Sequence, residues 1–431
     1  MKLRLKNVGK IKEADIKFDG ITVIAGENNT GKSTVGKILF CIYHSFYRME
    51  EQIKLEREKT IARTIDNFYR EVTNRYTLRF NSVRIAQYII DCRETFLADT
   101  RTIEKVLEEF FMGEDKTFLR KIDGERLEIL AEKIYNFLNI PDDEIRKNIL
   151  HKRLDEEFGM KVGHVNDLSN TAQIELLIKG NEIKFEIIKN EEISIEKHLS
   201  LVKEIIYIDD PFVLDDLQKS MRVPFLTYST FGHRGDLIDK IIDNEKEAEF
   251  SVVEELLAKK KLQKIYEAMD DVCEGTLVSA DDRRNYVYKS VKLNDELEIS
   301  NLSTGLKSFV ILRTLLQNGR IDENGIIILD EPEIHLHPEW QLRFAEIIVL
   351  IHKEFGTNIL LNTHSPYFLN AIEVFAEKYE IESKCNYYLT EEVGERTKIV
   401  DATEERELIY EKLARPLQDL ENMRYRYGDT V

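Results

Sequence analysis

The residues with the clearest chemistry form a glycine-rich loop near the start of the chain. Residues 26–33 read Gly-Glu-Asn-Asn-Thr-Gly-Lys-Ser and fit the pattern G-x-x-x-x-G-K-[ST]. In such a loop the backbone N–H groups surround phosphates, the lysine neutralises their charge and the hydroxyl reaches magnesium. The apolar run 21–25 precedes the loop and helix-compatible residues follow it, which is the strand–loop–helix order that this chemistry requires. The sequence therefore predicts a phosphate site that also binds Mg²⁺.

The residues predicted to contact the phosphate-bearing ligand are Gly26, Glu27, Asn28, Asn29, Thr30, Gly31, Lys32, Ser33 and Thr34.

Two adjacent carboxylates follow a second apolar run, residues 325–329. Asp330 is predicted to bind Mg²⁺ together with Ser33, and Glu331 to orient and polarise an attacking water. Two acids at this place could also be a solvated strand end. The phosphate loop upstream favours the catalytic interpretation.

A histidine ends a third apolar run. Residues 357–362 are typical of a core strand, which places Thr363 and His364 at its carboxyl end, where ligands bind in open α/β sheets. We expect His364 to sense the terminal phosphate. A lone histidine after an apolar run is more often structural, but the Ser-Pro break at 365–366 favours the functional interpretation.

A short segment before the acidic strand supplies a further phosphate contact. Ser303 is predicted to cap an apolar helix over 308–316, and Gly305 follows in its first turn. A serine cap followed by glycine leaves N–H groups that can receive a phosphate. An ordinary capped helix is the alternative.

In this order the four segments resemble the motifs of ABC-type ATPases, with 302–307 at the position of the ABC signature and Thr304 where a glycine is more usual. The resemblance implies that the ligand is ATP and the reaction its hydrolysis. It also implies that the signature helix of one head completes the ATP site of another, so that a homodimer or higher oligomer forms around sandwiched ATP.

Residues 1–11, 330–341 and 363–366 resemble more closely the RecF/SMC-like ATPases of the OLD family and the PtuA-like ATPases of Septu systems. OLD nucleases carry a C-terminal Toprim domain that needs an Asp-x-Asp pair, and no such pair follows His364. We therefore expect an ATPase without a nuclease of its own. The resemblance implies that it controls a separately encoded effector, often a nuclease, in bacterial defence against phage.

Two other functions stay open. The chain could be a RecF/SMC-like DNA-repair ATPase that grips DNA directly, or a head that binds ATP with negligible turnover and regulates a protein partner. The net charge of −18 disfavours a surface that generally coats DNA, although it permits a local basic groove. The runs Lys259–Lys261 and 283–284 are the densest basic spots in the middle of the chain.

A pair of histidines follows the acidic strand. His335 and His337, close to Glu331 and Glu333, could form a metal site, since histidine and carboxylate bind zinc. The family resemblance instead implies a loop that crosses to the partner head.

Composition indicates a cytoplasmic enzyme without a membrane partner. Of the 431 residues, 42% are apolar and 33% charged, and no apolar run approaches the ~20 residues that span a bilayer. The start of the chain lacks the apolar core of a signal peptide. The four cysteines form no C-x-x-C pair, which is typical of reduced thiols.

The expected fold class is α/β: an ABC-type P-loop head with a mixed core sheet and an antiparallel β subdomain, a large helical insertion and a short helical arm. The head is predicted over 1–40 and 164–431, the insertion over 41–163 and the arm over 211–275. A hairpin with its turn at Gly180-Asn181 is predicted in the antiparallel part. A C-terminal helix over 404–424 is expected to pack an apolar stripe on the head, with a surface for docking a partner as the alternative.

Overall fold

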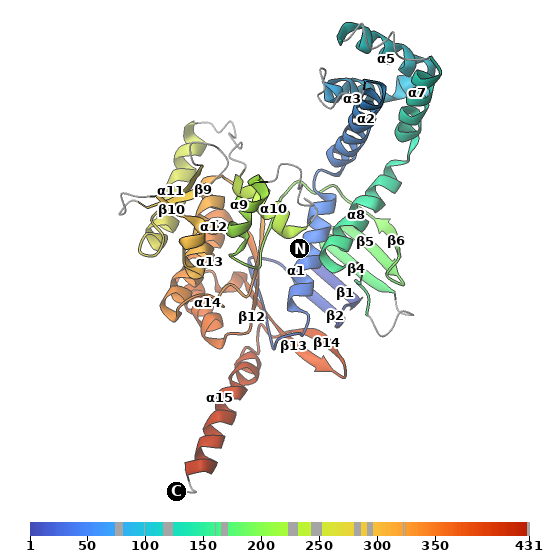
Figure 1. Cartoon of the computed structure of the whole chain (residues 1–431). Helices are drawn as coiled ribbons and strands as arrows, with labels where there is room; N and C mark the ends of the chain where they lie inside the picture. The colour runs from blue at the N-terminus through green and yellow to red at the C-terminus, as the bar shows by residue number, and fades with distance from the viewer. Residues whose placement is uncertain are drawn as a thin grey trace. The chain divides into compact units, whose positions relative to one another are not determined.

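The computed structural model describes residues 1–73, 81–98, 100–114, 124–159, 161–164, 171–222, 232–242, 252–279, 286–290, 296–321, 323 and 325–428 (Figure 1). The chain forms two compact units. The head unit comprises Met1–His44, Leu150–Leu199 and Lys203–Val431, and the insertion unit comprises Ser45–Ile149 with Ser200–Val202.

An eleven-stranded sheet runs through the head unit in the order β6-β5-β4-β1-β2-β14-β13-β3-β12-β11-β7. Its parallel part consists of β13 (Cys385–Val393), β3 (Ile21–Ala25), β12 (Asn358–Thr363), β11 (Ile326–Asp330) and β7 (Ile205–Ile208). Every residue of β3 and β7 is buried, as is typical of parallel strands covered on both faces. Parallel strands align their carboxyl ends, so the phosphate loop, Asp330 and His364 all leave the sheet at one edge.

The antiparallel part belongs to the same sheet. It consists of β1 (Lys2–Val8), β2 (Ile11–Lys17), β4 (Ala172–Ile178), β5 (Asn181–Ile188) and β6 (Glu192–Lys197). Strand β14 (Arg396–Asp401) joins the parts by pairing parallel with β2 and antiparallel with β13. The predicted α/β class, with a mixed core sheet and antiparallel strands, is confirmed.

A separate three-stranded antiparallel sheet was not predicted. It consists of β8 (Thr276–Ser279), β9 (Tyr286–Lys289) and β10 (Glu296–Glu298). These strands have only three or four residues each, too few for a clear alternating pattern in the sequence.

The hairpin turn lies one residue earlier than predicted. Ile178 pairs with Asn181, so Lys179 and Gly180 are the turn residues, with φ of 46° and 85°. Positive φ at both positions is the two-residue turn whose twist matches the flanking strands. The Gly180-Asn181 prediction was therefore wrong by one position.

Helices pack around this sheet. They are α1 (Lys32–Phe46), α9 (Val213–Arg222), α10 (His233–Ile242), α11 (Val252–Met269), α12 (Thr304–Gln317), α13 (Pro338–Phe355) and α14 (Pro366–Lys378). Short 3₁₀ turns occur at Ile299–Asn301 and Glu382–Lys384.

The described helices of the predicted arm, 211–275, belong to the core of the head unit. Leu217 of α9, Leu237 of α10 and Ile265 of α11 share one buried apolar cluster with Phe309 of α12. Burying these side chains stabilises the described parts of the three helices on the head. Residues 223–231 and 243–251 of the predicted arm lie outside the described residues.

The insertion unit is helical and has a core of its own. Its helices are α2 (Met49–Thr73), α3 (Ser82–Asp91), α4 (Arg93–Ala98), α5 (Thr100–Glu114), α7 (Gly124–Asn139) and the first half of α8 (Asp142–Phe158). Ile61, Ile65 and Ile134 lie in its buried cluster. The buried Arg57 guanidinium donates to the carbonyls of Phe137 and Ile140, at the end of α7. The boundaries differ from 41–163 because α1 continues to Phe46 and α8 continues to Phe158.

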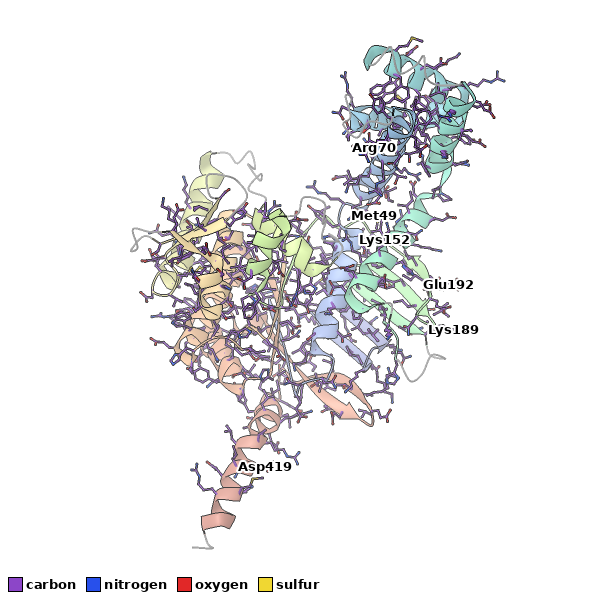
Figure 2. The ribbon with its side chains drawn as sticks, viewed as in Figure 1. Met49, Arg70, Lys152, Lys189, Glu192 and Asp419 are labelled. Carbon is purple, nitrogen blue, oxygen red and sulfur yellow. The ribbon has the colours of Figure 1, made fainter. Side chains whose placement is uncertain are left out.

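The C-terminal helix α15 (Glu407–Gly428) packs on the head only at its start. Ile409 is buried, and the Tyr410 hydroxyl donates to Glu373 at 2.8 Å. Farther along, Leu417 and Leu420 are 61% and 62% exposed, and Figure 2 shows the side chains around Asp419 without a neighbouring element. The prediction that the whole stripe packs on the head was wrong for this second half.

Among the described residues, no helix combines the length and the apolar composition that crossing a membrane requires.

Candidate functional site

The phosphate loop connects β3 to α1 and depends on two glycines. Gly26 has a φ of 155°, and a Cβ there would lie 1.8 Å from Thr390 Oγ1. Gly31 has a φ of 91°, and a Cβ there would lie 3.0 Å from Ile11. Only glycine fits such close approaches at positive φ. The Thr30 hydroxyl donates to Glu27 O at 2.7 Å and closes the loop.

Lys32 lies inside the loop. Its ammonium donates to Gly26 O at 3.0 Å and to Glu27 O at 2.8 Å, and it lies 3.3 Å from a Glu331 carboxylate oxygen. The residue is only 4% exposed. A buried ammonium needs such partners. They hold the positive charge of Lys32 beside the loop N–H groups that would bind phosphate.

Asp330 ends β11 with both carboxylate oxygens engaged. Asn362 Nδ2 donates to one oxygen at 2.9 Å, and the Tyr207 hydroxyl donates to the other at 2.9 Å. The donors come from β12 and β7, the two parallel neighbours of β11. Burial, followed by the nearby Asp330, raises the pKa of Tyr207 far above its usual value, so the phenol remains a hydrogen-bond donor.

Glu331 adopts a left-handed backbone conformation, with φ of 50°, directly after the strand. A non-glycine residue with this φ is uncommon, and such residues concentrate at functional sites. One of its carboxylate oxygens lies 3.3 Å from Lys32 Nζ and 3.4 Å from His364 Nδ1. The structure therefore brings together three predicted residues, Lys32, Glu331 and His364, that are far apart in sequence.

Glu333 holds the segment that carries His364. Its buried carboxylate accepts a hydrogen bond from Thr363 Oγ1 at 2.5 Å and another from His364 N at 3.4 Å. Burial raises the pKa of Glu333. This contact fixes the end of β12 and leaves the His364 ring 38% exposed, at the edge where the loop lies.

The residues at this edge fit Mg²⁺. Magnesium prefers oxygen ligands and uses one or two carboxylates together with substrate phosphates. Asp330 supplies a carboxylate whose hydrogen bonds come from uncharged donors, so its negative charge remains available to a cation. Ser33 would supply a hydroxyl. When bound, the ion would neutralise charge on the phosphate oxygens.

Ser303 and Gly305 lie in a different hollow. Ser303 caps α12 by accepting a hydrogen bond from Leu306 N at 3.3 Å, as predicted, and a Cβ on Gly305 would lie 3.0 Å from His335 O. The hollow has a volume of about 320 Å³ and is lined by Ser303, Thr304, Gly305, His335, His337 and Trp340. No residue of the phosphate loop lines this hollow.

The two histidines of this hollow have packing and capping contacts. His337 Nδ1 accepts from Glu339 N at 3.4 Å at the start of α13, and the His335 ring packs edge-on against Phe212. Within the described part of the chain, no three His, Cys, Asp or Glu side chains cluster as metal ligands.

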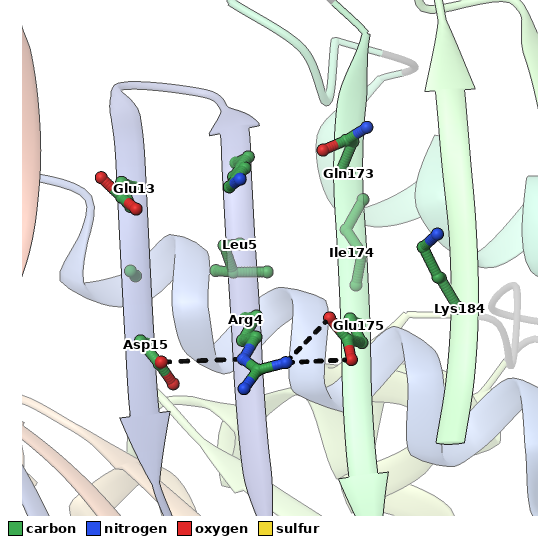
Figure 3. Close-up of a pocket in the computed structure, with 10 residues that line it drawn as sticks. Arg4, Leu5, Glu13, Asp15, Gln173, Ile174, Glu175 and Lys184 are labelled. Carbon is green, nitrogen blue, oxygen red and sulfur yellow. Dashed lines mark hydrogen bonds and ion pairs between the residues drawn. The ribbon is translucent and has the colours of Figure 1, made fainter.

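A hollow of similar size lies on the antiparallel part of the sheet (Figure 3). Arg4 lies there between Glu175, at 3.2 Å, and Asp15, at 3.6 Å. Opposite charges are paired across neighbouring strands, which is ordinary stabilisation of a solvated sheet face. None of the residues predicted to bind nucleotide lines this hollow.

Of the two basic spots, only the first lies among the described residues, and Lys259 there lines a hollow together with the acidic Glu267 and Asp270. Lys261 pairs with Glu323 at 2.6 Å, while residues 283–284 lie outside the described residues.

Comparison with known protein families shows which family the chain belongs to. Residues 1–369 match the family model described as AAA ATPase domain. The chain belongs to the AAA ATPase domain family. This membership confirms the predicted ATPase domain.

Three curated proteins are similar to this AAA ATPase over part of their length. "Retron Vc95 probable ATPase" of Vibrio cholerae serotype O1 biovar El Tor is 24% identical over 207 residues, covering 44% of this chain and 38% of that protein. "Septu protein PtuA" of Bacillus thuringiensis is 32% identical over 93 residues, covering 19% and 23%. "Retron Ec83 probable ATPase" of Escherichia coli is 33% identical over 93 residues, covering 19% and 17%. The chain thus spans less than two fifths of each of these relatives.

Among solved structures, an SMC head domain from Thermotoga maritima aligns over 93% of this AAA ATPase and 97% of that chain, with 14% identity and a TM-score of 0.38. An Smc head bound to the C-winged helix domain of ScpA aligns over 94% and 98%, with 12% identity and a TM-score of 0.45.

Sequence reasoning assigned no role to Tyr207 or Asn362, which hold Asp330. Asn362 was predicted only as the end of a core strand, and Tyr207 was not among the predicted site residues. A polar side chain in a fully buried strand must find a hydrogen-bond partner, which was the available signal.

Proposed function

We propose that this AAA ATPase binds ATP and Mg²⁺ between two copies of itself and hydrolyses ATP there. The observation that carries the proposal is the separation of the site into two parts. Lys32, Glu331 and His364 meet at one sheet edge, whereas Ser303 opens a hollow that no loop residue lines. A second copy facing the first would supply the missing helix start to each loop.

Each residue has a distinct task in this proposal. The loop N–H groups and Lys32 bind the phosphates, and Ser33 with Asp330 holds Mg²⁺. Glu331 orients the attacking water and accepts its proton, while His364 contacts the terminal phosphate and responds to its loss. ATP binding would join the heads, and hydrolysis would release them.

The cellular role proposed is control of a separately encoded effector, a nuclease by the family resemblance, in bacterial defence against phage. The partial similarity to retron and Septu proteins supports this role. Co-purifying the chain with the product of a neighbouring gene, and measuring nuclease activity with and without ATP, tests it. Nuclease activity of the pair that is the same with and without ATP, and that Lys32→Ala does not change, would contradict this role.

A mixing experiment tests the shared site. Lys32→Ala and Ser303→Arg should each be inactive alone, because each homodimer lacks one part of every site. A mixed pair has one site with both lesions and one intact site. An equal mixture should therefore regain up to about a quarter of the wild-type ATPase rate, since half of the pairs are mixed and hold one intact site of two.

The matched control mixes Lys32→Ala with Glu331→Gln. Both lesions affect the same side of the site, because Glu331 lies beside Lys32 in one chain. Each site of a mixed pair then has one lesion, and no activity should return. Recovery in the control, or wild-type turnover by Ser303→Arg alone, would refute the shared site.

A further inference from the structure

Tyr207 connects the two elements that carry the proposed metal ligands. It is fully buried in β7, and its hydroxyl donates to Asp330 Oδ2 at 2.9 Å. The same hydroxyl lies 3.5 Å from Ser33 O, in the first turn of α1. One phenol oxygen therefore contacts both the end of the acidic strand and the start of the loop helix.

The contact leaves Asp330 little freedom to rotate. Asn362 holds the other carboxylate oxygen at 2.9 Å from the opposite neighbouring strand. A carboxylate with one hydrogen bond can turn about its terminal torsion, which is broad and roughly two-fold. Two donors on two strands fix the plane of the group, and with it the direction of the lone pairs that remain for a cation.

A glycine in α1 leaves space for the Tyr207 hydroxyl. A Cβ on Gly36 of α1 would lie 3.3 Å from Tyr207 Oη and 3.0 Å from Ile328. Glycine inside a helix costs about 1 kcal/mol relative to alanine, so its presence in α1 needs a packing reason. The approach of the phenol to the helix supplies that reason.

The ring of Tyr207 rests on a buried charged cluster. It stacks on the His233 ring with centroids 4.5 Å apart and an interplanar angle of 28°. His233 is itself held between Glu157, at 2.7 Å, and Asp209, at 3.0 Å. The centroid of the Phe40 ring lies 6.2 Å from that of Tyr207. Packing against both aromatic neighbours fixes the orientation of the Tyr207 ring, and with it the direction of the hydroxyl.

We propose that Tyr207 is a positioning residue that, with Asn362, orients the Asp330 carboxylate for Mg²⁺ binding, and that Gly36 makes room for its hydroxyl. This role rests on the proposed function, because it assigns to Asp330 the magnesium of the ATP site. No contact of Tyr207 with ATP or the ion is part of this role. Tyr207 acts through Asp330.

The test replaces Tyr207 by phenylalanine, which keeps the ring and removes the hydroxyl. The matched control is Tyr388→Phe: Tyr388 is another buried tyrosine of the same sheet, and its hydroxyl accepts a hydrogen bond from Lys17 N at 2.8 Å. Binding of a fluorescent ATP analogue is titrated against Mg²⁺ and repeated in EDTA, and the melting temperature is recorded without ligand.

Tyr207→Phe should bind the analogue in EDTA as the wild type does. The Mg²⁺ concentration that gives half of the maximal enhancement of binding should be at least about tenfold higher than for the wild type. Tyr388→Phe should keep the wild-type Mg²⁺ requirement, although both variants lose a buried hydrogen bond and some thermal stability. Gly36→Ala provides a second variant: it keeps the hydroxyl but displaces it, and should raise the Mg²⁺ requirement in the same direction.

The failures are distinguishable. If wild-type binding depends on Mg²⁺ but Tyr207→Phe has the same requirement as Tyr388→Phe, the role of Tyr207 is wrong and the proposed function stands. If wild-type protein binds the analogue equally with Mg²⁺ and with EDTA, both the metal site and the role of Tyr207 are overturned.

Discussion

The buried His233 should make the stability of the head unit depend on pH. The imidazole lies between Glu157, at 2.7 Å, and Asp209, at 3.0 Å, and is 7% exposed. Burial disfavours the charged ring, but the hydrogen bonds and charges of Asp209 and Glu157 outweigh it and raise the pKa of His233 to about 9. The folded protein therefore holds a proton on this ring that the unfolded chain releases near its ordinary pKa of 6.5.

The sign and size of the effect follow from this difference. A raised histidine pKa contributes stability that is fully present below pH 6.5 and is lost as the pH rises through about 9. The full contribution is about 3 kcal/mol at 1.36 kcal/mol per pH unit, and roughly 2 kcal/mol of it should disappear between pH 6.5 and pH 8.5. The interaction is counted once, on the histidine, because the lowered pKa values of Glu157 and Asp209 describe the same contacts.

Urea unfolding of the wild type and of His233→Gln, measured between these two pH values, tests the prediction. The chain has a single tryptophan, Trp340, in the head unit, so its fluorescence reports on the unit that contains His233. Titrating groups that do not contact His233 are common to both proteins and cancel in the difference. The free energy of unfolding of the wild type, relative to that of His233→Gln, should fall by roughly 2 kcal/mol as the pH rises. A difference that stays constant with pH would refute the charged cluster.

Three further outcomes are expected at the nucleotide site. Lys32→Ala should abolish binding of a fluorescent ATP analogue, because it removes the buried charge that the loop places at the phosphates. Gly26→Ala should bind no analogue and melt at a lower temperature, because its Cβ would lie 1.8 Å from Thr390 Oγ1 at a φ of 155°; near-wild-type melting and binding would show that the loop tolerates a side chain. Glu331→Gln should retain ATP binding and slow steady-state hydrolysis at least about 100-fold, through loss of the base that orients the water; a wild-type rate would remove Glu331 from the mechanism.

The sequence predicted the parts of the site that lie next to a strand end. The loop after β3, Asp330 after β11 and His364 after β12 each follow an apolar run, and parallel strands bring such ends to one edge. Their meeting was therefore predictable without knowledge of side-chain contacts. Their roles with ATP and Mg²⁺ stay predictions.

Residues that act across strands were missed. The Tyr207 hydroxyl reaches Ser33 and Asp330, which lie 174 and 123 positions away, and strand order decides which side chains meet. Nothing in the local pattern of β7 states that β11 is its neighbour. The need of a buried hydroxyl for a partner indicates that a contact exists, but not with which residue.

The burial of α9–α11 and the exposure of the second half of α15 have a common physical cause. An amphipathic helix needs an apolar surface to cover its stripe, and periodicity alone does not say whether the chain supplies one. The head supplies an apolar surface that buries Leu217 and Leu237, whereas Leu417 and Leu420 stay exposed.

The central claim is that ATP joins two heads through the signature segment, and the mass of Glu331→Gln in solution tests it most directly. Sedimentation equilibrium with ATP and Mg²⁺ should give at least twice the monomer mass of 50.6 kDa, and the same protein without ATP should give a smaller species. Adding Ser303→Arg to Glu331→Gln should prevent the increase while ATP binding persists. An unchanged mass with ATP, or an increase that Ser303→Arg does not affect, would contradict the account.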